Sequence, residues 1–275
     1  MRMRKLYVAV LAAAVLLPAV SCGKNTSRPG PRRDDEDTAA ADWHKQALYL
    51  REEREINGTD YTFTIDLTGW DGYTTEEQIG VINDLFWEVY PAMYERFGVY
   101  SGAATDVTLA IEDFGYEIAC TSGDEVHLHD RWLYQWPDDY DCLTHEFAHV
   151  IQNGWDGAYL EYDSYIERFA DYCRYVYAYD DGFYNDTAWT LQTIEGEPDR
   201  ESSVRFLVWL DENYSSADND IMLKYYQVCY DRTYESDEWD EAWAYIFEGT
   251  VLAGMTADEV FDMYAGSEFA YGYDN

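Results

Sequence analysis

The residues best suited to chemistry lie in the stretch "CLTHEFAHVIQNGW", at positions 142–155. It places His145 and His149 four residues apart, with Glu146 directly after the first histidine. Residues with this spacing on a helix project from one face, so both imidazoles could bind one metal ion. Glu146 would lie about 100° around the helix from His145, where its carboxylate could contact a water on the metal. The spacing therefore predicts a metal site, and the alternative is a pair of core histidines bonded to neighbouring carbonyl groups.

A catalytic zinc site needs a third protein ligand and one open position. No histidine follows His149 in the chain, so the third ligand must be a carboxylate or a cysteine. The stretch "YIERFADYCR" offers Glu167 and Asp171, which share one face of a predicted helix. One of these acids could bind the metal while the other accepts a hydrogen bond from the second ring nitrogen of a ligand histidine. In a chain with 55 acidic residues, a solvated helix face is the alternative.

Both stretches resemble the basic secretory proteins, a family of plant and bacterial peptidases among the gluzincin-like zinc peptidases. The family's "HExTHVxQ" is similar to "HEFAHVIQ" in this chain, its "IEGIADYVR" to "IERFADYCR", and its "VTARFLDY" to "SSVRFLVWL". The resemblance covers roughly residues 61–264. It implies a zincin-like fold and a zinc site in which Glu167 is the third ligand and Asp171 supports a ligand histidine.

The spacing and the resemblance together lead to the hypothesis of a zinc-dependent peptidase that acts on a protein or peptide substrate. Zinc held by the two histidines and Glu167 would lower the pKa of its water, and Glu146 would take the proton as the water attacks the peptide carbonyl. Glu146 would then pass this proton to the leaving amine. Tyr162, Tyr165 and Arg205 are open candidates for stabilising the oxyanion.

A surface binding protein is the competing hypothesis. The chain contains 10 tryptophans and 27 tyrosines, which could form a platform for peptide or glycan on a zincin scaffold that has lost catalysis. The presence of Glu146 beside both histidines favours the enzyme, because an inactive scaffold has little use for a general base.

The first 21 residues have the features of a bacterial lipoprotein signal peptide. A basic start precedes an apolar run from Leu6 to Val20, which is too short and too poorly flanked for a stable membrane-spanning helix. The sequence "AVSC" is similar to the lipobox, with Ala19 where leucine is usual, and this resemblance implies that Cys22 is the lipidated mature N-terminus. We therefore expect an extracytoplasmic protein anchored by lipid to the outer membrane or cell surface, with plain secretion as the alternative.

Residues 22–42 are polar and rich in proline, glycine and charge, which is typical of a flexible tether. Residues 43–275 are expected to form one domain, since the whole chain is 47% hydrophobic and 17% aromatic, which argues against disorder. The formal charge is −37, and only 11 of the 18 lysine and arginine residues follow Asp34, against all 55 acids. Such an acidic surface repels phosphate backbones, so nucleic acid is not expected as a partner.

The cysteines leave two possibilities open. Beyond Cys22 the chain contains Cys120, Cys142, Cys173 and Cys229. An oxidising compartment would permit two disulfides in any of three pairings, and four buried free thiols are the alternative.

The predicted elements run from strands to helices, which indicates the α+β class. Strands are predicted at 60–67, 106–113, 116–121 and 124–130, with the last three as a small antiparallel sheet. Helices are predicted at 74–98, 165–179, 200–213, 219–231, 237–249 and 256–266. The expected zincin-like architecture is a small mixed or antiparallel sheet, then the active-site helix, the helix of Glu167 and a C-terminal helical region.

Three finer features are also expected. The active-site helix should begin after an N-cap at Asp138 or Asp139 and stop at Asn153–Gly154. Pro91 should kink its helix, because proline lacks the backbone N–H group. The strand at 124–130 should form the sheet edge that pairs with an extended substrate.

Overall fold

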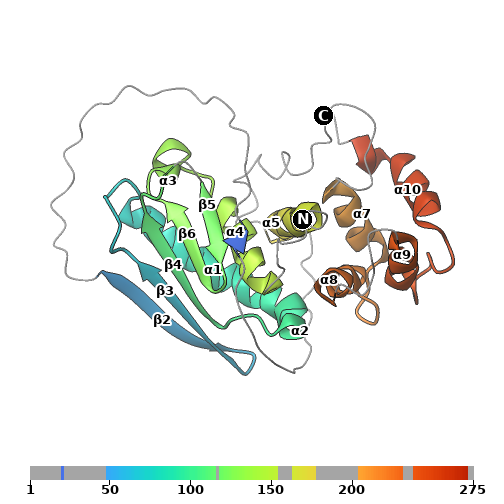
Figure 1. Cartoon of the computed structure of the whole chain (residues 1–275), viewed down its shortest axis with the longest axis horizontal. Coiled ribbons are helices and arrows are strands. Elements are labelled where there is room, and N and C mark those ends of the chain that lie inside the picture. The colour runs from blue at the N-terminus through green and yellow to red at the C-terminus, as the bar shows by residue number, and fades with distance from the viewer. Residues whose placement is uncertain are drawn as a thin grey trace.

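The computed structural model describes residues 20–21, 48–115, 118–153, 163–177, 204–231 and 238–271 (Figure 1). The predicted tether at 22–42, the lipidation site Cys22 and the first 19 residues of the predicted signal peptide lie outside these ranges. The last two residues of that peptide, Val20–Ser21, form the short strand β1.

The sheet is mixed, with strand order β1-β5-β6-β4-β3-β2. The five longer strands are β2 (Tyr49–Ile56), β3 (Thr59–Asp66), β4 (Asp106–Glu112), β5 (Ala119–Ser122) and β6 (Glu125–His129). Strands β3, β4 and β6 run parallel, while β1, β2 and β5 run antiparallel to the strands beside them. The α+β class is therefore confirmed.

The prediction that strands 106–113, 116–121 and 124–130 form an antiparallel sheet is wrong in one respect. Strand β6 returns past β5 and pairs in parallel with β4, and only β5 and β6 form an antiparallel pair. The short turns suggested that each strand would pair with the next. The nearly continuous burial of β4 instead suits a central position between parallel neighbours.

Strand β2 was not predicted from the sequence. Its residues "YLREEREI" show no alternation of apolar and polar side chains, and seven of the eight are exposed. It pairs with β3 through the two-residue turn Asn57–Gly58, where both φ angles are positive, at 52° and 83°. Such a turn matches the twist of an antiparallel hairpin, so the turn and not the strand pattern fixes this pairing.

The predicted helix at 74–98 is present as α1 (Glu76–Met93) followed by the π-helical turn η1 (Tyr94–Gly98). A capping box between Thr75 and Gln78 starts α1. The α-helix passes through Pro91, and the irregularity of this segment is the π-helical turn that follows it. The short helix α2 (Val99–Ser101) then ends at Gly102, whose φ is 65°.

The helix predicted to carry the active site is α4 (Asp141–Gln152), preceded by the short α3 (Trp132–Gln135). Its N-cap is Tyr140, without a side-chain hydrogen bond, so the prediction of Asp138 or Asp139 is wrong. Asp139 instead accepts hydrogen bonds from Trp132 Nε1 at 3.0 Å and Arg174 Nη2 at 2.8 Å. The predicted stop is confirmed at Asn153, which has a φ of 35°.

The remaining predicted helices are confirmed where the structure describes them. They are α5 (Asp163–Val176), α7 (Val204–Tyr214), α8 (Ile221–Asp231), α9 (Trp239–Phe247) and α10 (Ala257–Ala265), with the 3-10 turn η2 (Glu268–Tyr271) after them. In Figure 1 the sheet lies on one side of the molecule and α7 to α10 on the other, with α4 and α5 between them.

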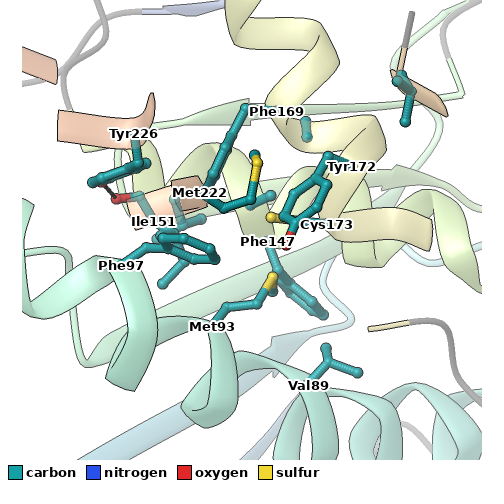
Figure 2. Close-up of a cluster of buried hydrophobic side chains, with 14 of the residues drawn as sticks. Val89, Met93, Phe97, Phe147, Ile151, Phe169, Tyr172, Cys173, Met222 and Tyr226 are labelled. Carbon is teal, nitrogen blue, oxygen red and sulfur yellow. Dashed lines mark hydrogen bonds between the residues drawn. The ribbon is translucent and has the colours of Figure 1, made fainter. Parts of the chain in front are cut away.

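One hydrophobic core joins the sheet to the helices, and it includes buried side chains from Tyr61 to Ala270. Phe147 of α4 is fully buried and meets Phe86 of α1 edge to face, with ring centroids 5.3 Å apart. Figure 2 shows Phe147 between Met93 of α1 and the α5 residues Tyr172 and Cys173. The burial of this face of α4 sets the rotation of the helix and turns its histidines toward α5.

A buried ionic cluster ties four helical segments together. Arg96 of η1 donates to Asp211 of α7 (Nη2 to Oδ1, 2.6 Å), to Asp220 before α8 (Nε to Oδ2, 2.7 Å) and to Tyr172 Oη of α5 (2.8 Å). Tyr172 Oη donates in turn to Asp211 Oδ2 at 2.6 Å. Only 17% of the Arg96 side chain and 15% of the Asp211 side chain are exposed, so solvent screens these contacts weakly.

This cluster predicts an acid-sensitive contribution to stability from Asp211. Burial acts to raise the pKa of Asp211, but the charge and hydrogen bonds of Arg96 outweigh it and lower the pKa. A lowered pKa stabilises the fold above the unfolded pKa of about 3.9, and the contribution is lost as pH falls through the folded value. In urea unfolding, we expect the stability difference between the native chain and Asp211→Asn to shrink below about pH 4. Asp240→Asn is the control, because Asp240 is an exposed residue of α9, and a difference independent of pH would contradict the prediction.

Candidate metal centre

The structure brings the two predicted histidine ligands together on α4. The Nε2 atoms of His145 and His149 lie 3.1 Å apart, and the two rings stand nearly perpendicular at an interplanar angle of 83°. Neighbouring residues of the same helix, Phe147, Val150 and Ile151, are buried in the core on its other side. The buried face therefore leaves both imidazoles directed toward α5.

Helix α5 supplies the third predicted ligand. Glu167 Oε2 lies 3.2 Å from His145 Nε2, and Glu167 Oε1 lies 3.7 Å from His149 Nε2. One ligand atom from each of the three residues lies within 4.8 Å of the others, so the group could hold a metal ion. The side chain of Glu167 is 35% exposed, against 16% and 7% for the two histidines, so the carboxylate lies on the solvent side of the centre.

The other nitrogen of each histidine is held by a hydrogen-bond acceptor. His145 Nδ1 lies 2.9 Å from Asp171 Oδ1, in the position predicted for Asp171. His149 Nδ1 lies 2.6 Å from Gln152 Oε1, and Gln152 Nε2 donates to the carbonyl of Ile166 at 2.8 Å. Because each Nδ1 faces an acceptor, it carries the proton, and the lone pair is left on Nε2. The role of Gln152 was not predicted from the sequence, although its place one turn after His149 was a usable signal.

This arrangement fits a cation. Two Nε2 lone pairs and a carboxylate converge on one point, and such donors repel one another unless a proton or a metal ion lies between them. Burial lowers the pKa of His145, but the hydrogen bonds and negative charge of Asp171 and Glu167 outweigh it and raise the pKa to about 10. Without metal, His145 would therefore hold a proton at neutral pH, and a metal ion would have to displace it.

We expect Gln152→Leu to weaken metal binding about 10- to 100-fold, because His149 loses the acceptor that orients its ring. Gln152→Glu keeps an acceptor oxygen at the same place and should retain most of the affinity. Titration of the metal-free protein with zinc in the presence of a competing chelator measures both values, with circular dichroism to confirm folding. Equal affinity for Gln152→Leu and the native chain would show that the contact has no role in metal binding.

Glu146 is buried beside the ligand group but does not belong to it. Its Oε2 accepts a hydrogen bond from Thr121 Oγ1 at 2.7 Å, and the same hydroxyl lies 3.0 Å from the Glu146 backbone oxygen. Thr121 lies on β5, so the sheet positions the carboxylate of Glu146 on α4. Nothing in the sequence pattern indicated Thr121, because the contact joins two elements that are distant in the chain.

The prediction that the strand at 124–130 forms the edge of the sheet is wrong. Strand β6, within the predicted range 124–130, lies between β4 and β5, while β5 carries Thr121 and has only the two-residue β1 on its other side. The histidines of β6 have local partners: His127 Nδ1 lies 2.7 Å from Glu112 Oε1, and His129 Nε2 lies 2.9 Å from the Gly115 oxygen. No second group of three potential ligands comes together in the parts of the chain that the structure describes.

Of the three candidates for stabilising the oxyanion, only Arg205 has a side chain that the structure describes. Tyr162 lies outside the described residues, and so does the side chain of Tyr165. Arg205, on α7, donates from Nη1 to the carbonyl oxygen of Phe269 at 3.1 Å, which ties it to the C-terminal turn.

The four cysteines other than Cys22 are free thiols in the structure, as in the second of the two possibilities, but only Cys142, Cys173 and Cys229 are buried and Cys120 is partly exposed. Cys142, one turn before the first histidine, donates from Sγ to the carbonyl oxygen of Asp139 at 3.0 Å. Burial raises the pKa of the Cys142, Cys173 and Cys229 thiols. These groups are therefore uncharged packing side chains and poor metal ligands at neutral pH.

Comparison with known proteins adds no relative. No family model, no curated protein and no solved structure matches the chain. The resemblance to the basic secretory proteins therefore stays a prediction that rests on short motifs. No helix within the described ranges is long and apolar enough to span a membrane.

Proposed function

We propose that this protein is a zinc-dependent peptidase. The observation that carries the proposal is the convergence of His145 Nε2, His149 Nε2 and the Glu167 carboxylate, with the Glu146 carboxylate held beside them by Thr121. Two imidazoles and one carboxylate are a donor set that suits zinc in catalytic sites, which leave a further position open. The motif resemblance supports the same proposal and extends it to a zincin-like fold of the basic secretory protein type.

Zinc, when bound, would supply Lewis acidity to a water molecule and to the peptide carbonyl. The chain's own residues then have distinct tasks. His145, His149 and Glu167 would hold the ion, while Asp171 and Gln152 keep the two rings in the tautomer that presents Nε2.

The Glu146 carboxylate would move the proton. It would accept a proton from the attacking water and return it to the nitrogen of the leaving amine. The hydrogen bond from Thr121 fixes Oε2, which favours proton transfer through the other carboxylate oxygen. The partner in this reaction is a protein or peptide.

The N-terminal sequence supports a proposal on location. A lipid on Cys22 would anchor the protein to the bacterial envelope, at the outer membrane or cell surface, and plain secretion is the alternative. Removal of the anchor by Cys22→Ala, followed by fractionation of cells and medium, distinguishes the two. Release of the variant but not of the native chain into the soluble fraction supports the anchor.

Metal removal tests the function. We expect the purified protein to contain about one equivalent of zinc, to cleave casein or a peptide library, to lose cleavage on chelation and to regain it when zinc is added. Elemental analysis and a fluorescent peptide assay measure these properties. A protein with zinc but no cleavage of a broad library would be a binding scaffold for peptide or glycan. Absence of zinc, together with undisturbed folding of His149→Ala, would overturn both zinc hypotheses.

A further inference from the structure

The strand β2 is an exposed edge at the far end of the sheet from the metal centre. It pairs with β3 on one side, and no described residue pairs with its other side. Seven of its eight residues are exposed. Tyr49 and Leu50 at its start are 56% and 43% exposed, and Leu48 directly before it is 40% exposed. An open strand edge presents unpaired N–H and C=O groups that can extend the sheet with another strand.

The register shows which residues present these groups. Leu67 N–H donates to the Leu48 oxygen at 2.8 Å, so the even-numbered residues of β2 direct their backbone groups toward β3. In an antiparallel ladder these positions alternate. The N–H and C=O groups of Arg51, Glu53 and Glu55 therefore point away from β3, into the open edge.

We propose that two copies of this chain pair through β2 in an antiparallel, two-fold symmetric arrangement centred on Glu53. Arg51 then lies opposite Glu55 of the second copy, and Glu52 lies opposite Arg54 of the second copy, each pair occurring twice by symmetry. Every arginine of the strand faces a glutamate. The outward backbone groups of Arg51, Glu53 and Glu55 form the ladder between the two sheets.

The charge pattern selects this register over its neighbours. A two-fold axis one residue earlier, at Glu52, would place Arg54 opposite Leu50 and leave it without a carboxylate across the interface. An axis at Arg54 would place that arginine against itself and Glu53 against Glu55. Like charges at an edge disfavour pairing. The alignment centred on Glu53 contains one like-charge pair, Glu53 with itself, but it is the one of these three that places both arginines opposite glutamates.

Three further observations favour a second copy as the occupant. Arg51 and Arg54 are two of only 11 lysine and arginine residues after Asp34, so this strand is rich in positive charge for an acidic chain. Arg54 is already held at the edge, with Nη2 2.7 Å from Glu52 Oε2 and its guanidinium 4.4 Å from the Trp87 ring centroid. The same register places Leu50 opposite Ile56 of the second copy, which covers an exposed apolar side chain.

A charge exchange tests the pairing in sedimentation velocity runs on the purified protein over a wide concentration range. We expect a monomer–dimer equilibrium in the native chain. Glu52→Arg and Arg54→Glu should each raise the dimer dissociation constant about tenfold or more, because each creates two like-charge pairs. The double variant Glu52→Arg/Arg54→Glu restores both pairs and should return the constant to near the native value.

The backbone ladder is tested at the centre of the interface. Glu53→Pro removes the outward N–H group, which β3 does not use, and should abolish the dimer while the melting temperature of the monomer stays close to native. Glu53→Gln keeps the N–H group and removes the central pair of like charges, so it should bind at least as well as the native chain. A native protein that is monomeric at every concentration, or a dimer that is insensitive to Glu53→Pro or is not restored by the charge exchange, overturns the proposal.

Discussion

Glu146→Gln is expected to lower the rate of peptide cleavage by between about 10²- and 10⁴-fold, the range in which a positioned general base contributes. Glutamine has nearly the same shape as glutamate, and its amide oxygen can still accept the hydrogen bond from Thr121. The variant cannot take a proton from water, however. Because Glu146 is outside the group of three ligands, we expect zinc content to remain at about one equivalent.

Loss of activity with retained metal is the informative result, since it separates proton transfer from metal binding. The measurements are zinc content by elemental analysis and kcat/KM on one peptide that the native chain cleaves. Glu241→Gln removes an exposed carboxylate of α9, far from the centre in sequence, and serves as the control. Unchanged kcat/KM in Glu146→Gln would exclude Glu146 as the base and would require a different source for the proton transfer.

Arg96→Met is expected to lower the free energy of unfolding by about 3–5 kcal/mol. The guanidinium binds Asp211, Asp220 and Tyr172, and its removal leaves two carboxylates with little access to water. Burial acts to lower the pKa of the Arg96 guanidinium, but the surrounding tyrosine and carboxylate groups outweigh burial and raise this pKa well above its usual range. Removing one member of a buried ionic cluster lowers the free energy of unfolding by more than the ion pairs contribute in net terms, because the charges that remain are buried without a partner.

Urea unfolding followed by circular dichroism measures this effect. Arg131→Met is the control, because Arg131 is exposed and its guanidinium lies over Tyr73, 4.1 Å from the ring centroid. Replacing Asp211 and Asp220 by asparagine in the Arg96→Met background removes the unpaired charges and should recover part of the loss. A change below about 1 kcal/mol in Arg96→Met would place the cluster among ordinary surface ion pairs.

Helix α4 and the placing of His145, Glu146 and His149 on it could be predicted from the sequence. Two histidines and a glutamate at helical spacing need only the geometry of one helix to lie as observed, so local information was sufficient. The same holds for the stop at Asn153, where one residue adopts a positive φ. Glu167 and Asp171 were identifiable as a pair from their spacing, but their distinct roles came only with the resemblance and with the packing of α5 against α4.

The contacts between distant segments could not be predicted from the sequence, because they depend on the tertiary structure. Thr121 approaches Glu146 because β5 lies beside α4, and Arg96 joins three helices that no periodicity links to it. The parallel pairing of β4 with β6 and the exposed strand β2 were likewise hidden, since short turns and charged residues give no pairing signal. Helical spacing is a property of a few consecutive residues, whereas strand order, ionic clusters and the acceptors behind each ligand depend on how the whole core packs.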